Sequence, residues 1–541
     1  MDSWSFVSIF EQLAAEVPDR LAVACGDERI SYAELDRRAN AVAWFLHDQG
    51  IGADDKVGID LVNSSAYMEV FFGAQKIGAV PFNVNYRYQA EELKYLLDNA
   101  DARAVFVHPD FAEPIEGAVE LLGGAAPVLV GVPHGEAPLP DSLAAHSLSA
   151  IRTDVRASEP PPRRAPTGDD LIFIYTGGTT GMPKAVMWRS DDLYQVLWMH
   201  ARPGKPLKDP LPAVQAGKRA ATVLPASPLM HGMALFMALG ALCGGGTVVL
   251  NESLRFDPAA AYDAIEEHQV QLLQIIGDAF ARPLVTVLRD QPDRWDLSSL
   301  AAISSSGMLW SPETKAAMLE LLPHLILLDG LGATESPMTR SVTTAATPAK
   351  SGKATFHMGE RIRVINDDDR DVQPGSGEMG MIAVSGPIPL GYYKDENKTA
   401  NTFRTIDGVR YSIPGDFATV SAEGELVLAG RGSVCINTGG EKVFPEEVEV
   451  VLRDHPAIYD VVVVGVPHDR WGEMVTAMIQ LDPAVGAPAG GDADFAAHAR
   501  GHLAGYKVPK AWITVESLDR SPSGKADYKA LRSRAIDTLP S

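Results

Sequence analysis

The segment that most constrains this chain is a short apolar run that leads directly into a loop rich in glycine and threonine. Residues 171–175 read LIFIY, which is typical of a buried strand, and residues 176–184 read TGGTTGMPK. Glycines let backbone N–H groups approach an anion closely, threonines add hydroxyl donors, and a lysine adds a mobile positive charge. These donors favour a polyphosphate site. They are Thr176, Gly177, Gly178, Thr179, Thr180, Gly181 and Lys184.

The loop differs from a Walker A loop in its spacing, and the residues after it, AVMW at 185–188, predict a second strand rather than a helix. A glycine-rich hairpin between two strands is the alternative interpretation. A hairpin needs turn residues, but it has no use for three threonines and a lysine together. We therefore favour phosphate binding.

Composition excludes several classes of protein. The 541 residues, with 46% hydrophobic and 22% charged residues, predict several packed globular domains. The formal net charge of −23 repels polyanions, so we expect no nucleic-acid partner. Cys25, Cys243 and Cys435 lie too far apart in sequence for a zinc motif or a disulfide framework. With an N-terminus that lacks the features of a signal peptide, these observations predict a cytoplasmic protein.

One uncharged run, residues 229–250, is long enough to span a bilayer. Three consecutive glycines, Gly244, Gly245 and Gly246, interrupt it. We expect a buried helix, a turn and a strand, and no membrane span.

Strand-like runs alternate with helical patterns over the first 110 residues, and Ser31 with Glu34 predicts a capping box at the start of one helix. This alternation predicts the α/β class, with parallel-type sheets that place ligands at the carboxyl ends of their strands. Residues 131–169 and 202–218 are irregular and predict surface connections, although the second could also be a loop that meets a phosphate. From Gly424 onward the pattern predicts a small α+β unit. We expect domains at 1–430 and 431–541.

On the loop at 176–184 the chain resembles the adenylate-forming superfamily, which contains acyl-CoA synthetases, luciferases and peptide-synthetase adenylation domains. The family's usual loop is TSGTTGxPKG, from which Gly177 and Ala185 depart. The resemblance implies that the loop covers the β- and γ-phosphates of ATP. It also implies a large N-terminal domain with a distorted β-barrel subdomain, followed by a small C-terminal domain on a hinge.

Two further motifs follow in the family's order. Residues 304–308, SSSGM, match the turn that lies against adenine. Residues 329–335, DGLGATE, match the motif in which Thr334 contacts the α-phosphate and Glu335 holds Mg²⁺, with Leu331 in place of the usual aromatic residue. A helix N-cap followed by an acidic residue is the alternative interpretation of Thr334 and Glu335. The implied ATP contacts are Ser306, Gly307, Met308, Asp329, Gly330, Leu331, Gly332 and Thr334.

Four motifs complete the resemblance. Residues 411–416, YSIPGD, match the motif whose Asp416 accepts hydrogen bonds from both ribose hydroxyls, since a carboxylate offers two acceptor oxygens. In GRGS at 430–433, Arg431 resembles the arginine on ribose or phosphate, and Ser433 stands at the hinge. RSPSGK at 520–525 resembles the motif with the catalytic lysine, here Lys525. NTGGEKV at 437–443 matches the loop that lines the CoA tunnel, which implies CoA contacts at Gly439, Gly440 and Glu441.

His231 matches a position that stands near the substrate carboxylate or gates the tunnel, although a histidine at the start of an apolar helix is commonly a core residue. The stretches that line the acyl pocket in relatives are small and aliphatic here, which suggests an apolar acyl group. The implied pocket residues are His231, Met233, Ala279, Met308 and Gly332.

The resemblance implies an AMP-forming acyl-CoA synthetase, an acid–thiol ligase that uses ATP, Mg²⁺ and CoA. Longer strings such as GYYKDENKTANTFR are most similar to bacterial acyl-CoA synthetases, including a subgroup for steroid side-chain acids. The substrate class is a fatty, branched or steroid side-chain acid, with aryl acids also open. A homodimer is also left open. Three alternatives are a ligase that loads a carrier protein, a catalytically silent nucleotide-binding relative, and a kinase-type enzyme that releases ADP. The first is less favoured because no carrier domain follows Lys525.

Overall fold

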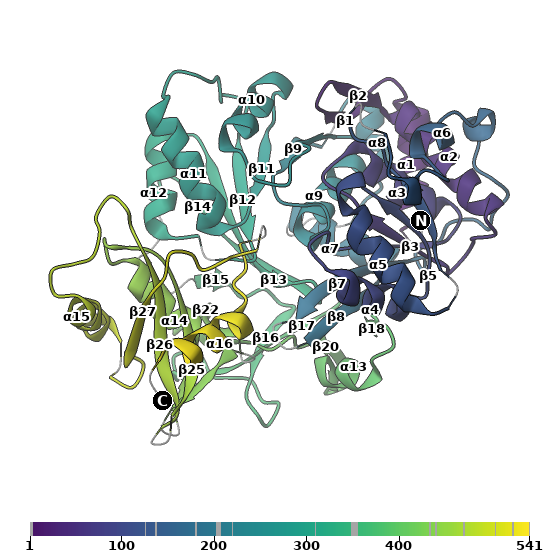
Figure 1. Ribbon diagram of the computed structural model, residues 1–541. Coiled ribbons are helices and arrows are strands. Elements are labelled where there is room, and N and C mark those ends of the chain that lie inside the picture. The colour runs from purple at the N-terminus through teal and green to yellow at the C-terminus, as the bar shows by residue number, and fades with distance from the viewer. Residues whose placement is uncertain are drawn as a thin grey trace.

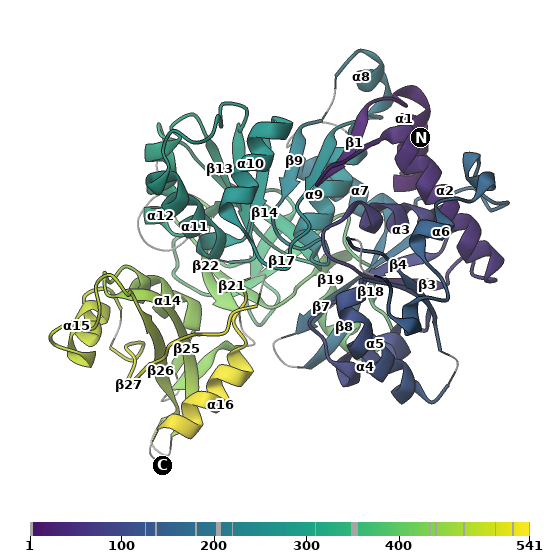
Figure 2. The ribbon, with the colours of Figure 1, turned by 45° about the horizontal axis from the view of Figure 1, so that its top comes forward.

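The computed structural model describes residues 4–124, 126–135, 138–178, 181–201, 207–218, 220–308, 310–347, 355–431, 434–438, 441–468, 471–503, 505–521 and 524–539. Two helix-covered sheets and an antiparallel sheet form a large body, and a small C-terminal unit lies beside them (Figures 1 and 2). The α/β class and the small C-terminal α+β unit expected from the sequence are confirmed.

The first sheet contains eight strands in the order β14-β13-β12-β11-β9-β10-β1-β2. The strands from β13 to β1 run parallel, and both edge strands are antiparallel to their neighbours. Their bounds are β1 (Leu21–Cys25), β2 (Glu28–Ser31), β9 (Thr222–Pro225), β10 (Thr247–Leu250), β11 (Leu272–Ile275), β12 (Ala302–Ser306), β13 (Ile326–Ala333) and β14 (Ser336–Thr343).

The second sheet has the order β18-β8-β7-β4-β3-β5-β6 and is parallel except at β8 and β18. The residues of its inner strands β3 and β4 are almost all buried, because helices cover both faces of the sheet. The bounds are β3 (Lys56–Asp60), β4 (Val80–Asn83), β5 (Ala102–Val107), β6 (Val128–Gly131), β7 (Leu171–Gly178), β8 (Gly181–Arg189) and β18 (Gly391–Tyr392).

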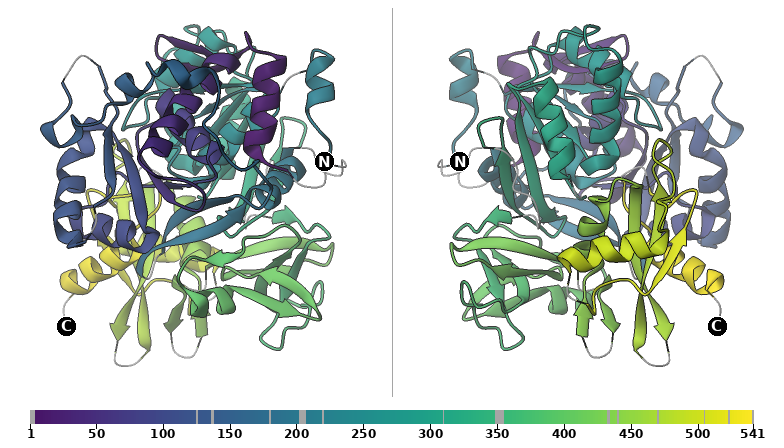
Figure 3. Two further views of the ribbon diagram at one scale, coloured as in Figure 1. Left: turned by 90° about the vertical axis from the view of Figure 1, so that its right-hand side faces the viewer. Right: turned by 90° about the vertical axis from the view of Figure 1, so that its left-hand side faces the viewer.

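The third sheet is antiparallel, in the order β15-β22-β21-β17-β20-β19 with β16 paired to β17, and it lies below the two helix-covered sheets (Figure 3). It has a core of its own around Ile382 and Leu426. The bounds are β15 (Thr355–His357), β16 (Ile362–Ile365), β17 (Gly380–Ser385), β19 (Phe403–Ile406), β20 (Val409–Ser412), β21 (Asp416–Val420) and β22 (Glu425–Arg431).

The C-terminal unit is built on a sheet with the order β24-β23-β26-β25, to which β27 adds in parallel to β26. The bounds are β23 (Ile436–Thr438), β24 (Glu441–Val443), β25 (Ile458–His468), β26 (Gly472–Leu481) and β27 (Ala511–Thr514). Three helices accompany this sheet, namely α14 (Pro445–Arg453), α15 (Asp492–His502) and α16 (Tyr528–Thr538).

The helices of the large body form three layers around its first two sheets. Helices α1 to α3, α7 and α9 share one hydrophobic core with both sheets. Helices α4 and α5 cover the outer face of the second sheet, and helices α10 to α12 cover the outer face of the first sheet. The bounds are α1 (Phe6–Glu16), α2 (Tyr32–Asp48), α3 (Ser65–Lys76), α4 (Ala90–Ala100), α5 (Ala112–Leu122), α6 (Leu148–Ile151), α7 (Ser190–Ala201), α8 (Leu211–Gln215), α9 (Gly232–Leu242), α10 (Pro258–His268), α11 (Gly277–Asp290), α12 (Pro312–Leu321) and α13 (Glu396–Thr402), with short 3-10 turns η1 (Pro109–Phe111), η2 (Asp141–Leu143) and η3 (Val155–Ser158).

The uncharged run at 229–250 folds as expected, with the buried helix α9, a glycine turn and the strand β10. Within the described residues, no helix is both long enough and apolar enough to cross a membrane.

The capping box at α2 forms only in part: the Ser31 hydroxyl accepts from the Glu34 backbone N–H, while the Glu34 carboxylate binds Arg37 and Arg38 instead. Both irregular stretches also contain short helical segments, such as α8.

Lys76, at the end of α3, is a fully buried cation. Its ammonium group lies 2.6 Å from a Glu11 carboxylate oxygen and 2.8 Å from an Asp36 oxygen, and its side chain has no exposed surface. Arg163 binds the same Glu11 carboxylate. This cluster therefore ties α1, α2 and α3 together with the connection that precedes β7.

Replacing Lys76 by alanine should destabilise the fold by about 3–5 kcal/mol, because the substitution leaves half-buried carboxylates without their cation. Urea unfolding followed by circular dichroism measures this change. The matched control is Lys94→Ala, since Lys94 is partly exposed and lies 3.4 Å from Asp98 on the surface of α4. The control should change the stability by less than about 0.5 kcal/mol, and equal effects of the two substitutions would contradict the assignment.

Candidate active site

The predicted phosphate loop lies at the tip of an antiparallel hairpin. Strands β7 and β8 pair along their length, with Thr176 opposite Lys184 and Gly178 opposite Gly181. The hairpin considered as an alternative is therefore present as a backbone shape. It holds the donor-rich segment at the carboxyl end of β7, the edge at which parallel sheets bind ligands.

Thr334 and Glu335 form the tight turn between β13 and β14, where Ala333 pairs with Ser336. The indole N–H of Trp188, on β8, donates a 3.0 Å hydrogen bond to the Thr334 carbonyl oxygen. Trp188 is fully buried, so this bond fixes the turn against the strand that begins at the phosphate loop. The helix N-cap interpretation of Thr334 is wrong, since a strand follows the turn.

Two side chains that the sequence analysis did not single out connect these elements. The Tyr392 hydroxyl donates a 2.7 Å hydrogen bond to Glu335 Oε1. The ammonium group of Lys184 lies 2.6 Å from Asp395 Oδ2, and the hydrogen bond that it donates is the main cause that lowers the pKa of Asp395. Both partners belong to the segment GYYKDENKTANTFR, which the resemblance covered without assigning roles within it.

The strands that carry the predicted adenine contacts are neighbours. Ser306 pairs with Gly330 across β12 and β13, which brings the turn with Gly307 and Met308 beside the 329–335 motif. Gly307 has a φ of +88°, a conformation that glycine adopts readily. Leu331 packs in part against the core of the antiparallel sheet.

Asp329 is the residue of this motif whose side chain is already bound within the protein. Its carboxylate is buried and lies 2.8 Å from the ammonium group of Lys315, on α12. Burial raises the pKa of Asp329, and the charge of Lys315 opposes that effect. This carboxylate therefore anchors α12 to β13. Because the side chain is occupied in this way, any contact of Asp329 with ATP would be made by its backbone.

Asp416 and Arg431, the predicted ribose contacts, stand opposite each other in the register of β21 and β22. Asp416 is buried, with 5% of its surface exposed. The structure thus brings together two residues that are 15 positions apart in sequence.

His231 precedes the first turn of α9, and the residue that follows it lies close to Thr334. A Cβ atom built on the next residue, Gly232, would lie 3.7 Å from the Thr334 hydroxyl oxygen. The ring Nε2 of His231 is buried without a hydrogen-bond partner among the described residues. Burial is the main cause that lowers the pKa of His231 to about 3, and the positive charges of Lys525 and Arg87 lower it further. His231 is therefore a neutral imidazole near pH 7.

The segment with Lys525 reaches the same site from the C-terminal unit. A Cβ atom on Gly524 would meet the sulfur of Met308 and would lie 3.3 Å from the Ala279 methyl group. Gly524 has a φ of +71° and is buried, whereas Lys525 is exposed. This contact places Lys525 at the rim of the predicted acyl and adenine pockets, and the effect of its charge on His231 agrees with that position.

Some predicted positions lie outside the described residues, namely Thr179, Thr180, Ser433, Gly439 and Gly440. Glu441 begins β24, an edge strand of the C-terminal sheet. Met233 is half-buried in the first turn of α9, and Gly332 lies beside a bulge in β13.

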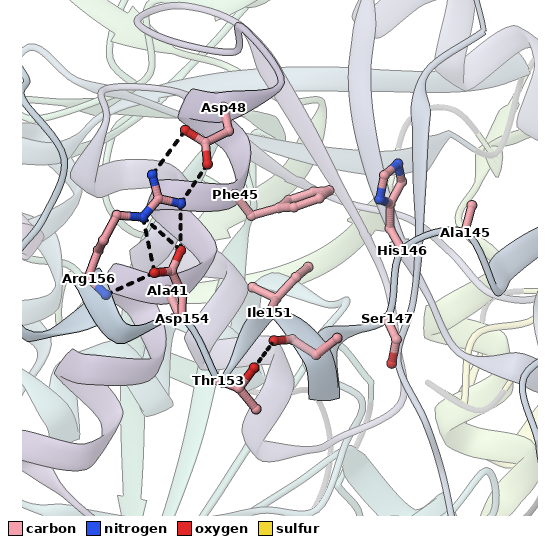
Figure 4. Close-up of a pocket in the computed structure, with 11 residues that line it drawn as sticks. Ala41, Phe45, Asp48, Ala145, His146, Ser147, Ile151, Thr153, Asp154 and Arg156 are labelled. Atoms are coloured by element: carbon pink, nitrogen blue, oxygen red, sulfur yellow. Dashed lines mark hydrogen bonds and ion pairs between the residues drawn. The ribbon is translucent and has the colours of Figure 1, made fainter.

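A cavity of about 340 Å³ lies elsewhere, between the end of α2 and the segment around α6 (Figure 4). The Arg156 guanidinium at its rim already binds the carboxylates of Asp48 and Asp154. None of the predicted site residues lines this cavity, so we do not assign it to the acyl substrate.

Comparison with known proteins identifies the family. Residues 10–393 match the family model "AMP-binding enzyme", and residues 447–525 match "AMP-binding enzyme C-terminal domain". The chain belongs to the family of AMP-binding enzymes, which confirms the predicted family.

The chain is 40% identical over 529 residues to the medium/long-chain-fatty-acid–CoA/3-oxocholest-4-en-26-oate–CoA ligase of Mycobacterium tuberculosis, covering 97% of this chain and 95% of the relative. It is 38% identical over 524 residues to the 3-oxocholest-4-en-26-oate–CoA ligase of Rhodococcus rhodochrous, covering 95% and 92%. The crystal structure of the anthranilate CoA ligase AuaEII in complex with anthranoyl-AMP shares the fold, with a TM-score of 0.81, 22% identity, and coverage of 98% of this chain and 97% of that chain.

Replacing Lys525 by alanine should raise the pKa of His231, because one nearby positive charge is lost, yet leave it below about 6.5, because burial is the larger cause. Histidine-selective ¹³C NMR titration measures this shift, with the His231→Gln variant assigning the signal. Lys529→Ala is the control, since Lys529 is an exposed lysine on α16. If the pKa of His231 is equal in the wild type, Lys525→Ala and Lys529→Ala, Lys525 does not approach His231 in solution.

Proposed function

We propose that this chain is an AMP-forming acyl-CoA ligase that activates an apolar carboxylic acid of the fatty acid or steroid side-chain class. The observation that carries the proposal is the meeting of separate segments at one place. The hairpin with Lys184, the turn with Thr334 and Glu335, and the start of α9 are in contact, and the segment before Lys525 reaches the neighbouring turn at Met308. Phosphate donors, a carboxylate and a mobile lysine are the groups that adenylate formation requires.

The substrate class is supported by the relatives and by the side chains at the site. The relatives are named for fatty acids and for 3-oxocholest-4-en-26-oate. The positions that the resemblance assigns to the acyl pocket include Met233, Ala279, Met308 and Gly332, and none of these four residues carries a polar side chain. His231 is neutral, so it adds no charge that would favour a polar acyl chain.

We propose that Glu335 holds Mg²⁺ together with the phosphates of ATP. Oε1 of Glu335 accepts from Tyr392, and Oε2 receives no hydrogen bond from the described residues. No cluster of three or more His, Cys, Asp or Glu side chains suited to a metal occurs within the described part of the chain. A single carboxylate fits Mg²⁺, which commonly binds one or two carboxylates plus substrate phosphates. When bound, Mg²⁺ would neutralise charge on the phosphate oxygens.

In the first half-reaction a carboxylate oxygen of the acid attacks the α-phosphorus of ATP, and the bond from that phosphorus to pyrophosphate breaks. Negative charge builds on the phosphate oxygens. Lys184 and Lys525 supply positive charge there, and the Thr334 hydroxyl donates to the α-phosphate. Asp416 accepts from the ribose hydroxyls and fixes the nucleotide, with Arg431 opposite.

In the second half-reaction the CoA sulfur attacks the acyl carbon, and the bond to AMP breaks. We propose that residues 431–541 turn about a hinge near Ser433 for this step, so that Gly439, Gly440 and Glu441 approach the site as Lys525 leaves. One cavity cannot present the lysine and a thiol path at the same atoms. The observed contact of Gly524 with Met308 and Ala279 supports assigning this structure to the first half-reaction.

We also propose a cytoplasmic location, which is supported by the buried thiols of Cys25 and Cys243. A homodimer stays a prediction from sequence.

Pyrophosphate release across a panel of fatty, steroid side-chain and aryl acids tests the proposed function. We expect release that requires ATP and an apolar acid, and formation of acyl-CoA and AMP when CoA is added. A carrier-loaded phosphopantetheine is tested as the alternative thiol. Thioester formed only on the carrier would contradict the CoA assignment, release of ADP would indicate kinase-type chemistry, and no activity with any acid would favour a silent relative.

Lys525→Ala should lower the rate of adenylate formation by about 10²–10³-fold, as expected for the loss of one transition-state contact. The same variant should still convert a supplied acyl-adenylate to acyl-CoA, because Lys525 leaves the site in the second step. Single-turnover assays of each half-reaction separate the two rates. Equal loss of both half-reactions would show that the role of Lys525 is misassigned. The control variant is Lys529→Ala, which should catalyse both half-reactions at the wild-type rates.

A further inference from the structure

The partner of the metal-binding carboxylate lies on a segment to which the sequence motifs assigned no role. The Tyr392 hydroxyl lies 2.7 Å from Glu335 Oε1, and the two residues are 57 positions apart in sequence. This is the one hydrogen bond that the described residues give to the Glu335 carboxylate. It is therefore the contact that decides how the carboxylate is oriented.

The Tyr392 side chain is held firmly from several directions. Its residue pairs with Val186 on β8, and its backbone N–H donates a 2.9 Å hydrogen bond to the Thr399 hydroxyl. Its ring packs at 5.8 Å from the ring of Phe403, and only 5% of the residue is exposed. A donor fixed in this way fixes its acceptor at little cost in side-chain entropy.

We propose that Tyr392 is a positioning residue that orients the Glu335 carboxylate for the Mg²⁺ that accompanies ATP. Its hydroxyl engages Oε1 and directs Oε2 toward the metal, in the way that outer hydrogen bonds orient metal ligands in proteins. The inference rests on the proposed function, since it concerns the metal site of the same reaction.

The chemistry of the donor suits this role. Burial is the main cause that raises the pKa of Tyr392 well above its usual range, and the Glu335 charge raises it further. The hydroxyl therefore keeps its proton at neutral pH and remains a donor. A neutral donor also leaves the charge of Glu335 for the metal, whereas a lysine or an arginine at this position would neutralise it.

The same segment also holds the phosphate-loop lysine. Asp395 Oδ1 accepts from the Lys398 backbone N–H at the start of α13, while Oδ2 binds the ammonium group of Lys184. That ammonium group lies 5.9 Å from the centre of the Tyr392 ring. A four-residue stretch thus contacts both the metal-binding carboxylate and the lysine of the phosphate loop.

The test is the affinity for Mn²⁺ in the presence of saturating α,β-methylene-ATP, an analogue that cannot release pyrophosphate. Electron paramagnetic resonance of free Mn²⁺ reports the affinity without any turnover. Tyr392→Phe should weaken Mn²⁺ binding by about 10–100-fold, the usual effect of losing an outer partner of a metal ligand. The ring is retained, so the packing on Phe403 should stay.

Tyr393→Phe is the matched control. It removes the same hydroxyl from the adjacent tyrosine, but that hydroxyl donates to Asp101 at the surface. Its Mn²⁺ affinity should equal that of the wild type. Equal affinities of Tyr392→Phe and Tyr393→Phe would overturn the proposal. In a Glu335→Gln background, Tyr392→Phe should have no further effect on the affinity.

A second readout is the Mg²⁺ concentration that gives half-maximal pyrophosphate release. We expect this concentration to rise in Tyr392→Phe, with most of the maximal rate recovered at high Mg²⁺, a pattern that general destabilisation does not produce. If the wild type releases no pyrophosphate with any acid, the proposed function fails, while the Mn²⁺ affinities still decide the role of Tyr392. If the wild type is active and the two variants bind Mn²⁺ equally, only the positioning role fails.

Thermal unfolding of both variants shows whether they are folded. Should Tyr392→Phe lose its fold, 4-fluorophenylalanine placed at position 392 keeps the ring and fills the space of the hydroxyl oxygen but cannot donate a hydrogen bond. The Mn²⁺ affinity of this variant should fall by about 10–100-fold. An affinity equal to that of the wild type would overturn the proposal.

Discussion

The backbone pairing of strand β8 is the constraint on which the rest of the site depends. This strand begins at the phosphate loop, pairs with β7 on one side and with β18 on the other, and carries Lys184 and Trp188. Trp188 holds the Thr334 turn, and β18 presents Tyr392 to Glu335. A shift of one residue in its register would turn each of these side chains to the opposite face of the sheet. The relative placement of Lys184, the Thr334 turn and the Glu335 carboxylate is thus set by backbone hydrogen bonds.

The site is divided between a rigid part and a part contributed by the C-terminal unit. The rigid part is built at the carboxyl ends of β9, β12 and β13, whose backbone hydrogen bonds are satisfied within the first sheet. The C-terminal unit adds Lys525 through a buried glycine that rests on Met308 and Ala279. A contact made through small and flexible side chains can be broken at modest cost, which agrees with the proposed rotation of this unit during turnover.

His231 illustrates how burial changes the meaning of a motif residue. As a residue type it titrates near neutral pH, but its buried ring and two nearby cations lower its pKa to about 3. His231 therefore lowers the stability of the folded state only as the pH falls below about 6.5. In that range the unfolded chain binds a proton at this residue, whereas the folded chain does not. Near pH 7 the residue therefore contributes the packing of its ring and an uncharged ring nitrogen.

Much of the fold was predictable because its signals are local. The glycine interruption at 244–246 divided helix α9 from β10, and the apolar run at 171–175 defined β7, as both features lie within one element. The motifs likewise named Thr334, Glu335, Asp416 and Lys525 by order and spacing. Asp329 shows the limit of that reasoning, because its motif position gave no sign that Lys315 on α12 binds its carboxylate.

The sequence by itself determined the set of chemical groups: a donor-rich loop, a Thr–Glu turn, the Asp416 carboxylate and a lysine near the C-terminus. Only the tertiary structure decided which of them touch and which other residues join them. Tyr392 and Asp395 carry no local signal, since their partners lie 57 and 211 positions away and meet them only after β18 pairs with β8. Contacts of this kind depend on sheet register and burial, which arise when distant segments pack and are not encoded in any short stretch of the chain.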